Sequence, residues 1–184
     1  MKYLLFRQLG SHDIMMDTIM ETQFSKVYKM TYQDDIIYTY VNAYVEDLKV
    51  LFEDLSGELL SDFLVYMSPA MDEKEVPQHI EMCQTILKNI HVERGVLSNR
   101  DILKKLLHQY DTTTKKFILG KYHQQTYMID TIKTYLEHNQ NMMTASKELF
   151  IHRNTLMMRL EKFKEVTGFD VKTFYDGFLI YHLL

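Results

Sequence analysis

The stretch TASKELFIHRNTLMMRLEKF, residues 144–163, decides the fold of the C-terminal part of this chain. Two short runs with the apolar spacing of helices flank a turn at residues 150–152, in which Ile151 is the expected buried aliphatic residue. Ala145 lets the two helices cross closely, because a larger side chain there would push them apart. Arg153 begins the second helix, and its apolar stripe consists of Leu156, Leu160 and Phe163. This spacing predicts a helix-turn-helix.

Helices are also expected on both sides of this pair, so that four follow one another from Tyr127 onward. The first ends at His138–Asn139, and its apolar face consists of Ile129, Ile132 and Leu136. We expect Asn141 to cap the helix Met142–Leu149, and Thr167–Gly168 to end the helix that begins at Arg153.

The last helix is the most apolar of the four. Asp170 is its expected N-cap, and Phe174, Phe178 and Tyr181 repeat at i, i+4 and i+7. The region from residue 126 to the C-terminus is therefore predicted to be all α-helical.

The helix from Arg153 presents polar residues at its start. With its apolar stripe turned inward, Asn154, Met158 and Glu161 point outward, and the flanking residues are Arg153, Thr155, Arg159 and Lys162. Such a helix can offer its first turn to base edges and its flanking cations to phosphates. The alternative is a capped surface helix, in which Asn and Thr bond backbone N–H groups and Arg stays in water.

A family resemblance favours the first interpretation. The segment NMMTASKELFIHRNTLMMRLEKFKEVTGFDV resembles the C-terminal helix-turn-helix of the bacterial regulators of purine catabolism (PucR) and sugar-diacid utilisation (CdaR). The matching positions are Tyr135–Glu137, Ala145, Leu149, Ile151–Leu156, Arg159–Leu160, Lys162 and Thr167–Gly168. Met157 and Met158 stand where members of that family often have a basic or polar residue and a Tyr. The resemblance implies a transcription factor whose recognition helix contains Arg153, Asn154, Thr155 and Arg159.

The DNA-binding residues that we predict follow from the helical wheel and this resemblance. Arg153 and Asn154 are the expected base contacts, and Thr155, Arg159 and Lys162 are expected to position the helix on the backbone. For His152 a turn and capping role is favoured over base contact. The complete candidate set is Thr144, His152, Arg153, Asn154, Thr155, Met158, Arg159 and Lys162.

The part before residue 98 alternates between strand and helix patterns. Strands are expected at Tyr3–Phe6, in a hairpin of two aromatic and β-branched runs separated by Gln33, Asp34 and Asp35, and at residues 63–67. Three helical patterns lie between and after these strands. The expected apolar faces are Ile14, Met15, Thr18 and Ile19, then Leu48, Leu51, Phe52, Leu55 and Leu59, and then Ile80, Cys83, Ile86, Leu87 and Ile90.

These patterns predict an α+β fold: a small α/β part followed by the all-α helix-turn-helix domain. The first part resembles the degenerate GGDEF-like domain that many PucR- and CdaR-type regulators carry. We expect a GGDEF-like domain at residues 1–97, a helical connector at 98–125, broken at Gly120, and the DNA-binding domain at 126–184. The segments VLSNRDILKKLL and FILGKY also resemble the family upstream of its helix-turn-helix, and no separate N-terminal effector domain is expected in this chain.

Composition and charge limit the classes of function. The 184 residues are 46% hydrophobic and 25% charged, which is typical of a globular protein. The formal net charge is -4, and from residue 126 onward seven Lys and Arg balance seven Asp and Glu. The acidity therefore belongs to the first part. The start has no signal-peptide pattern, and no apolar run is long enough for a membrane helix. We expect a cytoplasmic protein in which the single Cys83 is buried as a small hydrophobe.

Two other classes of function compete with a DNA-binding regulator. Nucleotide cyclases with the GGDEF fold need a Gly-Gly turn and adjacent carboxylates, whereas this chain has no Gly-Gly pair, and its only adjacent Asp pair, Asp34–Asp35, is better explained as a turn. Catalysis, a metal and a cofactor are therefore not expected. The other class is an interaction module that kept the helix-turn-helix fold but lost DNA, which the neutral charge and the outward Glu161 favour. The prediction is a DNA-binding regulator, acting as a homodimer on double-stranded DNA, with an effector that the sequence does not name.

Overall fold

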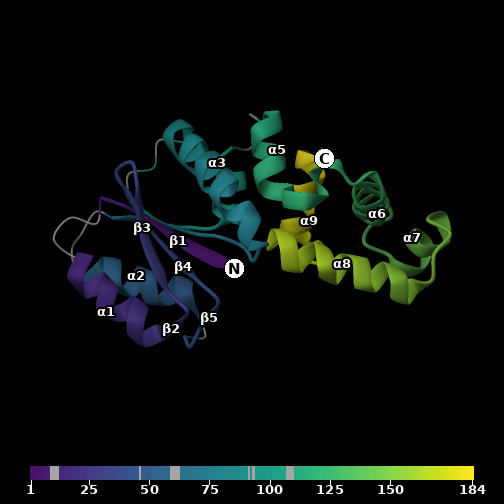
Figure 1. Cartoon of the computed structure of the whole chain (residues 1–184). Helices are drawn as coiled ribbons and strands as arrows, with labels where there is room; N and C mark the ends of the chain where they lie inside the picture. The colour runs from purple at the N-terminus through teal and green to yellow at the C-terminus, as the bar shows by residue number, and fades with distance from the viewer. Residues whose placement is uncertain (9–12, 46, 59–62, 91, 93, 107–109) are drawn as a thin grey trace. The chain divides into compact units, whose positions relative to one another are not determined.

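The computed structural model describes residues 1–8, 13–45, 47–58, 63–90, 92, 94–106 and 110–184. The chain divides into two compact units, Met1–Ser98 and Asn99–Leu184. The first is mixed α+β and the second is helical (Figure 1). Among the described residues, no helix combines the length and hydropathy that a bilayer span requires.

A five-stranded sheet forms the centre of the first unit. Its order is β3-β4-β1-β6-β7, and its neighbours are antiparallel except for the parallel pair of β6 and β7. The strands span β1 (Lys2–Arg7), β3 (Tyr28–Tyr32), β4 (Asp35–Tyr40), β6 (Leu64–Met67) and β7 (Gly95–Leu97), and β2 (Phe24–Ser25) pairs separately with β5 (Asn42–Ala43). The strand predicted at Tyr3–Phe6, the hairpin and the strand predicted at residues 63–67 are confirmed. The short strands β2, β5 and β7 were not predicted.

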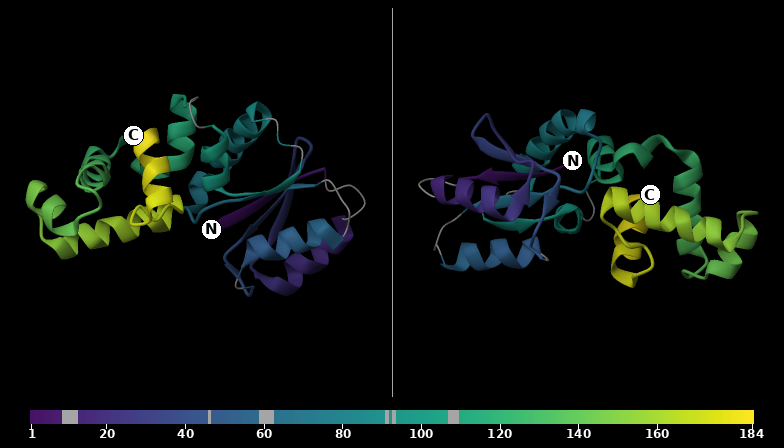
Figure 2. Two further views of the ribbon diagram at one scale, coloured as in Figure 1. Left: turned by 180° about the vertical axis from the view of Figure 1, so that it is seen from behind. Right: turned by 60° about the horizontal axis from the view of Figure 1, so that its bottom comes forward.

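Helices cover both faces of this sheet. They are α1 (Asp13–Gln23), α2 (Leu48–Glu58) and α3 (Val76–Asn89), with a short 3-10 turn, η2 (Glu73–Glu75), before α3. Figures 1 and 2 show α1 and α2 together on one side of the sheet and α3 on the other. Because successive strand residues point to opposite faces, β1 buries Leu4 and Phe6 toward α1 and α2, and Tyr3 and Leu5 toward α3. This accounts for a central strand that is apolar on both sides.

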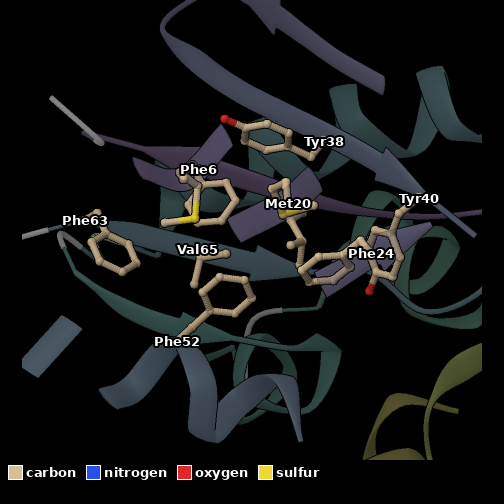
Figure 3. Packing of buried hydrophobic residues seen from close by; sticks show 10 residues of the cluster. Phe6, Met20, Phe24, Tyr38, Tyr40, Phe52, Phe63 and Val65 are labelled. Atoms are coloured by element: carbon tan, nitrogen blue, oxygen red, sulfur yellow. The ribbon is translucent and has the colours of Figure 1, made fainter. Parts of the chain in front are cut away.

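The core between the sheet and the helices α1 and α2 is largely aromatic (Figure 3). Phe6 lies 5.5 Å from Phe52 of α2 and 5.7 Å from Tyr38 of β4, between ring centroids and with edge-to-face geometry. Such pairs add roughly 0.5–1.5 kcal/mol to the burial of the rings. On the other face, the Tyr3 hydroxyl lies 2.7 Å from His79 Nδ1 of α3. Both layers are thus attached to β1.

Two predictions about side-chain placement in this unit are wrong. In α1 the buried residues are Met16 and Met20, whereas Ile14 of the predicted apolar face is 81% exposed. Several apolar residues are spaced around this helix, so periodicity alone chose the wrong side. Asp35 is not a turn residue but the first residue of β4, where it is 2% exposed and accepts from Arg7 Nε at 2.8 Å and from Gln84 Nε2 at 2.8 Å.

The other predicted faces fit better. Ile80, Cys83, Ile86 and Leu87 of α3 are buried as expected, with Ile90 partly buried. In α2, Phe52 is fully buried and Leu48, Leu51 and Leu55 are partly buried, whereas Leu59 lies outside the described residues.

The second unit consists of helices joined by short turns. They are α4 (Asn99–Lys105), α5 (Thr112–Leu119), the 3-10 helix η3 (Gly120–Gln124), α6 (Thr126–Glu137), α7 (Met142–Glu148), α8 (Arg153–Thr167) and α9 (Phe174–Leu183). Gly120 has a φ of 53° and ends α5, as predicted. The segment expected to be a connector is helical in its described part, and from Asn99 it lies within the second unit.

The last helix is placed differently from the prediction. Thr173, not Asp170, is the N-cap of α9, because its side chain accepts from the Asp176 backbone N–H. The repeating Phe174, Phe178 and Tyr181 are 81%, 43% and 49% exposed. The buried residues are instead Asp176, Gly177, Leu179, Ile180 and Leu183. Because α9 is apolar on nearly every side, the spacing of its aromatic residues did not show which face packs; Gly177 lies on the packed face, close to Leu136 of α6.

Candidate nucleic-acid interface

The first helix of the predicted pair is held by its cap and by Ala145. The Asn141 side chain accepts from the backbone N–H groups of Met143 at 3.0 Å and Thr144 at 3.2 Å, as an N-cap does. Ala145 is fully buried at the crossing of α7 with its neighbours. Both features agree with the prediction. Thr144 is exposed, and its hydroxyl donates to the Asn141 carbonyl at 3.2 Å.

The turn between α7 and α8 is closed by two backbone hydrogen bonds, from Phe150 N to Lys147 O at 3.1 Å and from Ile151 N to Ser146 O at 3.0 Å. Phe150 occupies the left-handed region with a φ of 53°, and its side chain is 95% exposed. Ile151 is half-buried, whereas full burial was expected. The turn leads directly into the start of α8 (Figure 1).

Helix α8 begins where the sequence predicted. His152 is the N-cap: its Nδ1 accepts from the Asn154 N–H at 3.2 Å, which agrees with the capping role. Arg153, Asn154 and Thr155 form the first turn, and all three are exposed. Gly168, with a φ of 81°, ends the helix in the left-handed conformation that glycine adopts without strain.

The opposite side of α8 is fully packed. Leu156 and Phe163 are 0% exposed and Leu160 is 2% exposed, so the predicted stripe is the buried face. The Phe163 ring stacks on Tyr122 of η3 with 5.9 Å between centroids. Because this face is fixed in the core, the orientation of the first-turn side chains toward solvent is fixed as well.

Arg159 is placed differently from the other predicted cations. It is partly buried, its Nη1 donates to Thr131 Oγ1 of α6 at 2.7 Å, and its guanidinium lies 5.3 Å from the centroid of the Tyr127 ring. These contacts attach α8 to α6. Tyr127 and Thr131 are one helical turn apart, and sequence reasoning did not pair them with Arg159 because nothing local marks that contact.

The outer side of α8 changes character along its length. Met158, one turn after Asn154, is 57% exposed, and Lys162 is exposed. Glu161, the outward carboxylate, accepts from Lys172 Nζ, and Lys164 Nζ donates to Asp170 at 2.9 Å. This last bond holds the pKa of the Asp170 carboxyl below its ordinary value. Glu161 and Asp170 are therefore each paired with a lysine.

An ion pair between a half-exposed arginine and a buried aspartate joins the two ends of the second unit. Arg100 of α4 donates to both carboxylate oxygens of Asp176 in α9, each at 2.6 Å, and the Asp170 N–H donates to the same carboxylate at 2.8 Å. The hydrogen bond to Asp176 raises the pKa of Arg100. The two residues are 76 positions apart, so the sequence contains no local signal for this pair.

Comparison with known proteins identifies this arrangement. Residues 128–184 match the family model of the PucR C-terminal helix-turn-helix domain. The chain carries a PucR C-terminal helix-turn-helix domain. The resemblance inferred from the sequence is thus confirmed. Within the PucR domain, the described residues contain no group of three or more His, Cys, Asp or Glu side chains that could hold a metal ion, and the same is true of the other described residues.

Curated relatives match part of this chain and are longer than it. The carbohydrate diacid regulator of Escherichia coli (strain K12) is 45% identical over 51 residues, which is 28% of this chain and 13% of that protein. The uncharacterized protein YxkF of Bacillus subtilis (strain 168) is 40% identical over 53 residues, 29% of this chain and 18% of that protein. The DNA-binding transcriptional activator AdeR of the same strain is 32% identical over 92 residues, 48% of this chain and 22% of that protein. The chain thus matches less than a quarter of the length of each.

Proposed function

We propose that this protein is a cytoplasmic transcriptional regulator that binds specific double-stranded DNA through α7 and α8. The observation that supports the proposal most directly is the exposed first turn of α8. Arg153, Asn154 and Thr155 face solvent there, while the opposite side of the helix is locked into the core. A helix held in this way can place its N-terminal side chains in a major groove.

Each candidate residue has a proposed role. Arg153 pairs with guanine and Asn154 with adenine, since these side chains match the acceptor and donor patterns of those bases, and each bidentate pair is worth roughly 1–3 kcal/mol of discrimination. Thr155 and Lys162 bond phosphates, and Thr144 does so from α7. His152 holds the helix start. Arg159 orients α8 against α6 through the hydrogen bond that it donates to Thr131, and its remaining N–H groups can donate to the DNA backbone.

The electrostatics are compatible with this proposal despite the neutral charge of the domain. The pairing of Glu161 with Lys172 and of Asp170 with Lys164 reduces the repulsion that free carboxylates would exert on phosphates. A homodimer doubles the phosphate contacts on two half-sites. We assign dimerisation or signal reception to the α+β unit, which we propose to be GGDEF-like. Two of the relatives are a carbohydrate diacid regulator and a transcriptional activator, which supports the regulatory class.

The test is selection of binding sites from random-sequence duplexes with the full chain, at two salt concentrations. We expect an enriched site, palindromic if the protein acts as a dimer, and weaker binding at the higher salt. Arg153→Ala should abolish the sequence preference with an unchanged circular dichroism spectrum. Lys164→Ala is the matched control: it removes one positive charge from the same helix and takes from Asp170 its lysine partner, so it should weaken binding to all sequences alike and keep the sequence preference.

An interaction module without DNA binding is the rival. It predicts a flat selection at both salt concentrations and no difference between Arg153→Ala and Lys164→Ala. That result would overturn the proposed function.

A further inference from the structure

Beside the polar first turn, the outer face of α8 carries an apolar side chain that the fold does not use. Met158 is 57% exposed, although the helix buries Leu156 and Leu160 on either side of it in sequence. It lies four residues after Asn154, so the two side chains stand one above the other on the same face. The packing of the domain therefore does not explain Met158.

The chemistry of the major groove offers a partner for such a side chain. The C5-methyl group of thymine is the apolar feature that base pairs display in this groove, and apolar side chains recognise it by contact. An Asn amide in the same groove pairs with adenine N6 and N7. Four helical residues rise about 6 Å, whereas successive base pairs are about 3.4 Å apart. Contacts made by Asn154 and Met158 would thus fall one or two base pairs apart.

We infer that Met158 is a specificity-determining residue that contacts a thymine methyl group one or two base pairs from the adenine bound by Asn154. The inference rests on the proposed function and adds the base class that the site selects. It predicts two A·T pairs, one or two positions apart, in each half-site. The contact belongs to the first two turns of α8, because the outward residues that follow, Glu161 and Glu165, are carboxylates and not apolar side chains.

The neighbouring Met157 supplies a matched control. It is 48% exposed, close to the value of Met158, but it lies about 100° from Met158 around the helix, on the other side of Asn154 and nearer the flank that carries Arg153. A general effect of surface apolarity would involve both methionines equally. Direct contact with a methyl group would involve Met158 alone.

The experiment uses uracil, which lacks only the C5-methyl group of thymine. The full chain first selects a site from random-sequence duplexes, and each thymine of the enriched site is then replaced in turn by uracil. Burial of one methyl group predicts that uracil at one position of the half-site weakens binding about fourfold. Met158→Ala should remove the difference between thymine and uracil at that position, and Met157→Ala should retain it.

The outcomes separate this inference from the proposed function. An enriched site whose binding does not change at any uracil position would overturn the inference and leave the regulator standing. Equal loss of the methyl effect in Met157→Ala and Met158→Ala would also overturn it. If no site is enriched, the proposed function fails first, and the inference fails with it.

Discussion

Gly177 of α9 offers a quantitative test of how the second unit is packed. In a helix interior, Gly→Ala ordinarily stabilises by up to about 1 kcal/mol, because Ala loses less backbone entropy on folding. At Gly177, however, an added Cβ would lie 3.0 Å from Gln140 Nε2, 3.0 Å from Leu136 Cδ2 and 3.3 Å from the Val171 carbonyl oxygen. The sign of the effect therefore depends on whether these neighbours can move.

Two of the three neighbours resist displacement. The Leu136 methyl group can rotate away, but the Val171 oxygen is backbone, and Gln140 Nε2 donates to Val171 O at 2.7 Å and to Thr173 O at 3.1 Å. Overpacking costs about 1–3 kcal/mol, and each weakened hydrogen bond adds about 0.5–1.5 kcal/mol. We expect these costs to exceed the helix gain, so that Gly177→Ala lowers the free energy of unfolding of this unit by about 1–3 kcal/mol.

Amide hydrogen exchange of α6 and α9 in the full chain measures this loss locally, with urea unfolding as a second measurement. Gly57→Ala in α2 is the control, because its added Cβ would meet nothing within 4 Å and should stabilise slightly. Combining Gly177→Ala with Gln140→Ala should cost less than the sum of the two single changes, because the crowded amide is gone. A Gly177→Ala protein as stable as the parent, or more stable, would refute this account of the α6–α9 contact.

Three further predictions concern the charged and titratable groups. Asp176→Asn keeps the size of the side chain but removes the charge that Arg100 contacts. Because the Arg100 side chain is 45% exposed and can turn into water, we expect the free energy of unfolding in urea to fall by only about 1–2 kcal/mol, and by less at high salt. An unchanged free energy of unfolding at both salt concentrations would contradict this prediction. Burial raises the pKa of Tyr40 from 10.0 to about 12, so between these pH values the folded state keeps a proton that the unfolded state loses. The free energy of unfolding should therefore fall as the pH rises from about 10 toward 12. Tyr40→Phe should reduce this fall in alkaline unfolding curves. Burial also raises the pKa of the Cys83 thiol, which is 0% exposed. Iodoacetamide should therefore label Cys83 only when the first unit unfolds. Rapid labelling of the native protein would contradict the buried position of this thiol.

The sequence predicted the helix-turn-helix well because its signals are local. Asn141, the turn at 150–152 and Gly168 act through their own backbone neighbours, so the limits of α7 and α8 follow from residues within a few positions of each end. The Leu156 stripe is similarly readable, because polar residues occupy the other sides of α8. For the same reason the resemblance to the PucR domain could be stated from this segment alone.

Faces and partners were harder to predict where the local pattern is ambiguous. The helix α9 is apolar nearly all round, and α1 carries apolar residues on several sides, so spacing could not say which side packs. Of the candidate DNA-binding residues, the structure places Arg153, Asn154 and Thr155 together on an exposed turn, whereas Arg159 bonds α6. Their contacts with DNA remain predictions.

The sequence by itself determined the order of the strands and helices whose patterns are clear, and the caps of α7 and α8. It also determined the polar first turn of α8, which suggests a DNA-binding helix. Only the tertiary structure decided that Gly177 faces α6, that Asp35 is buried beside Arg7, and that Arg100 pairs with Asp176. The physical reason is range: a cap or an apolar repeat acts over one or two helical turns, whereas these contacts join residues 28 to 76 positions apart that meet only when the chain is folded.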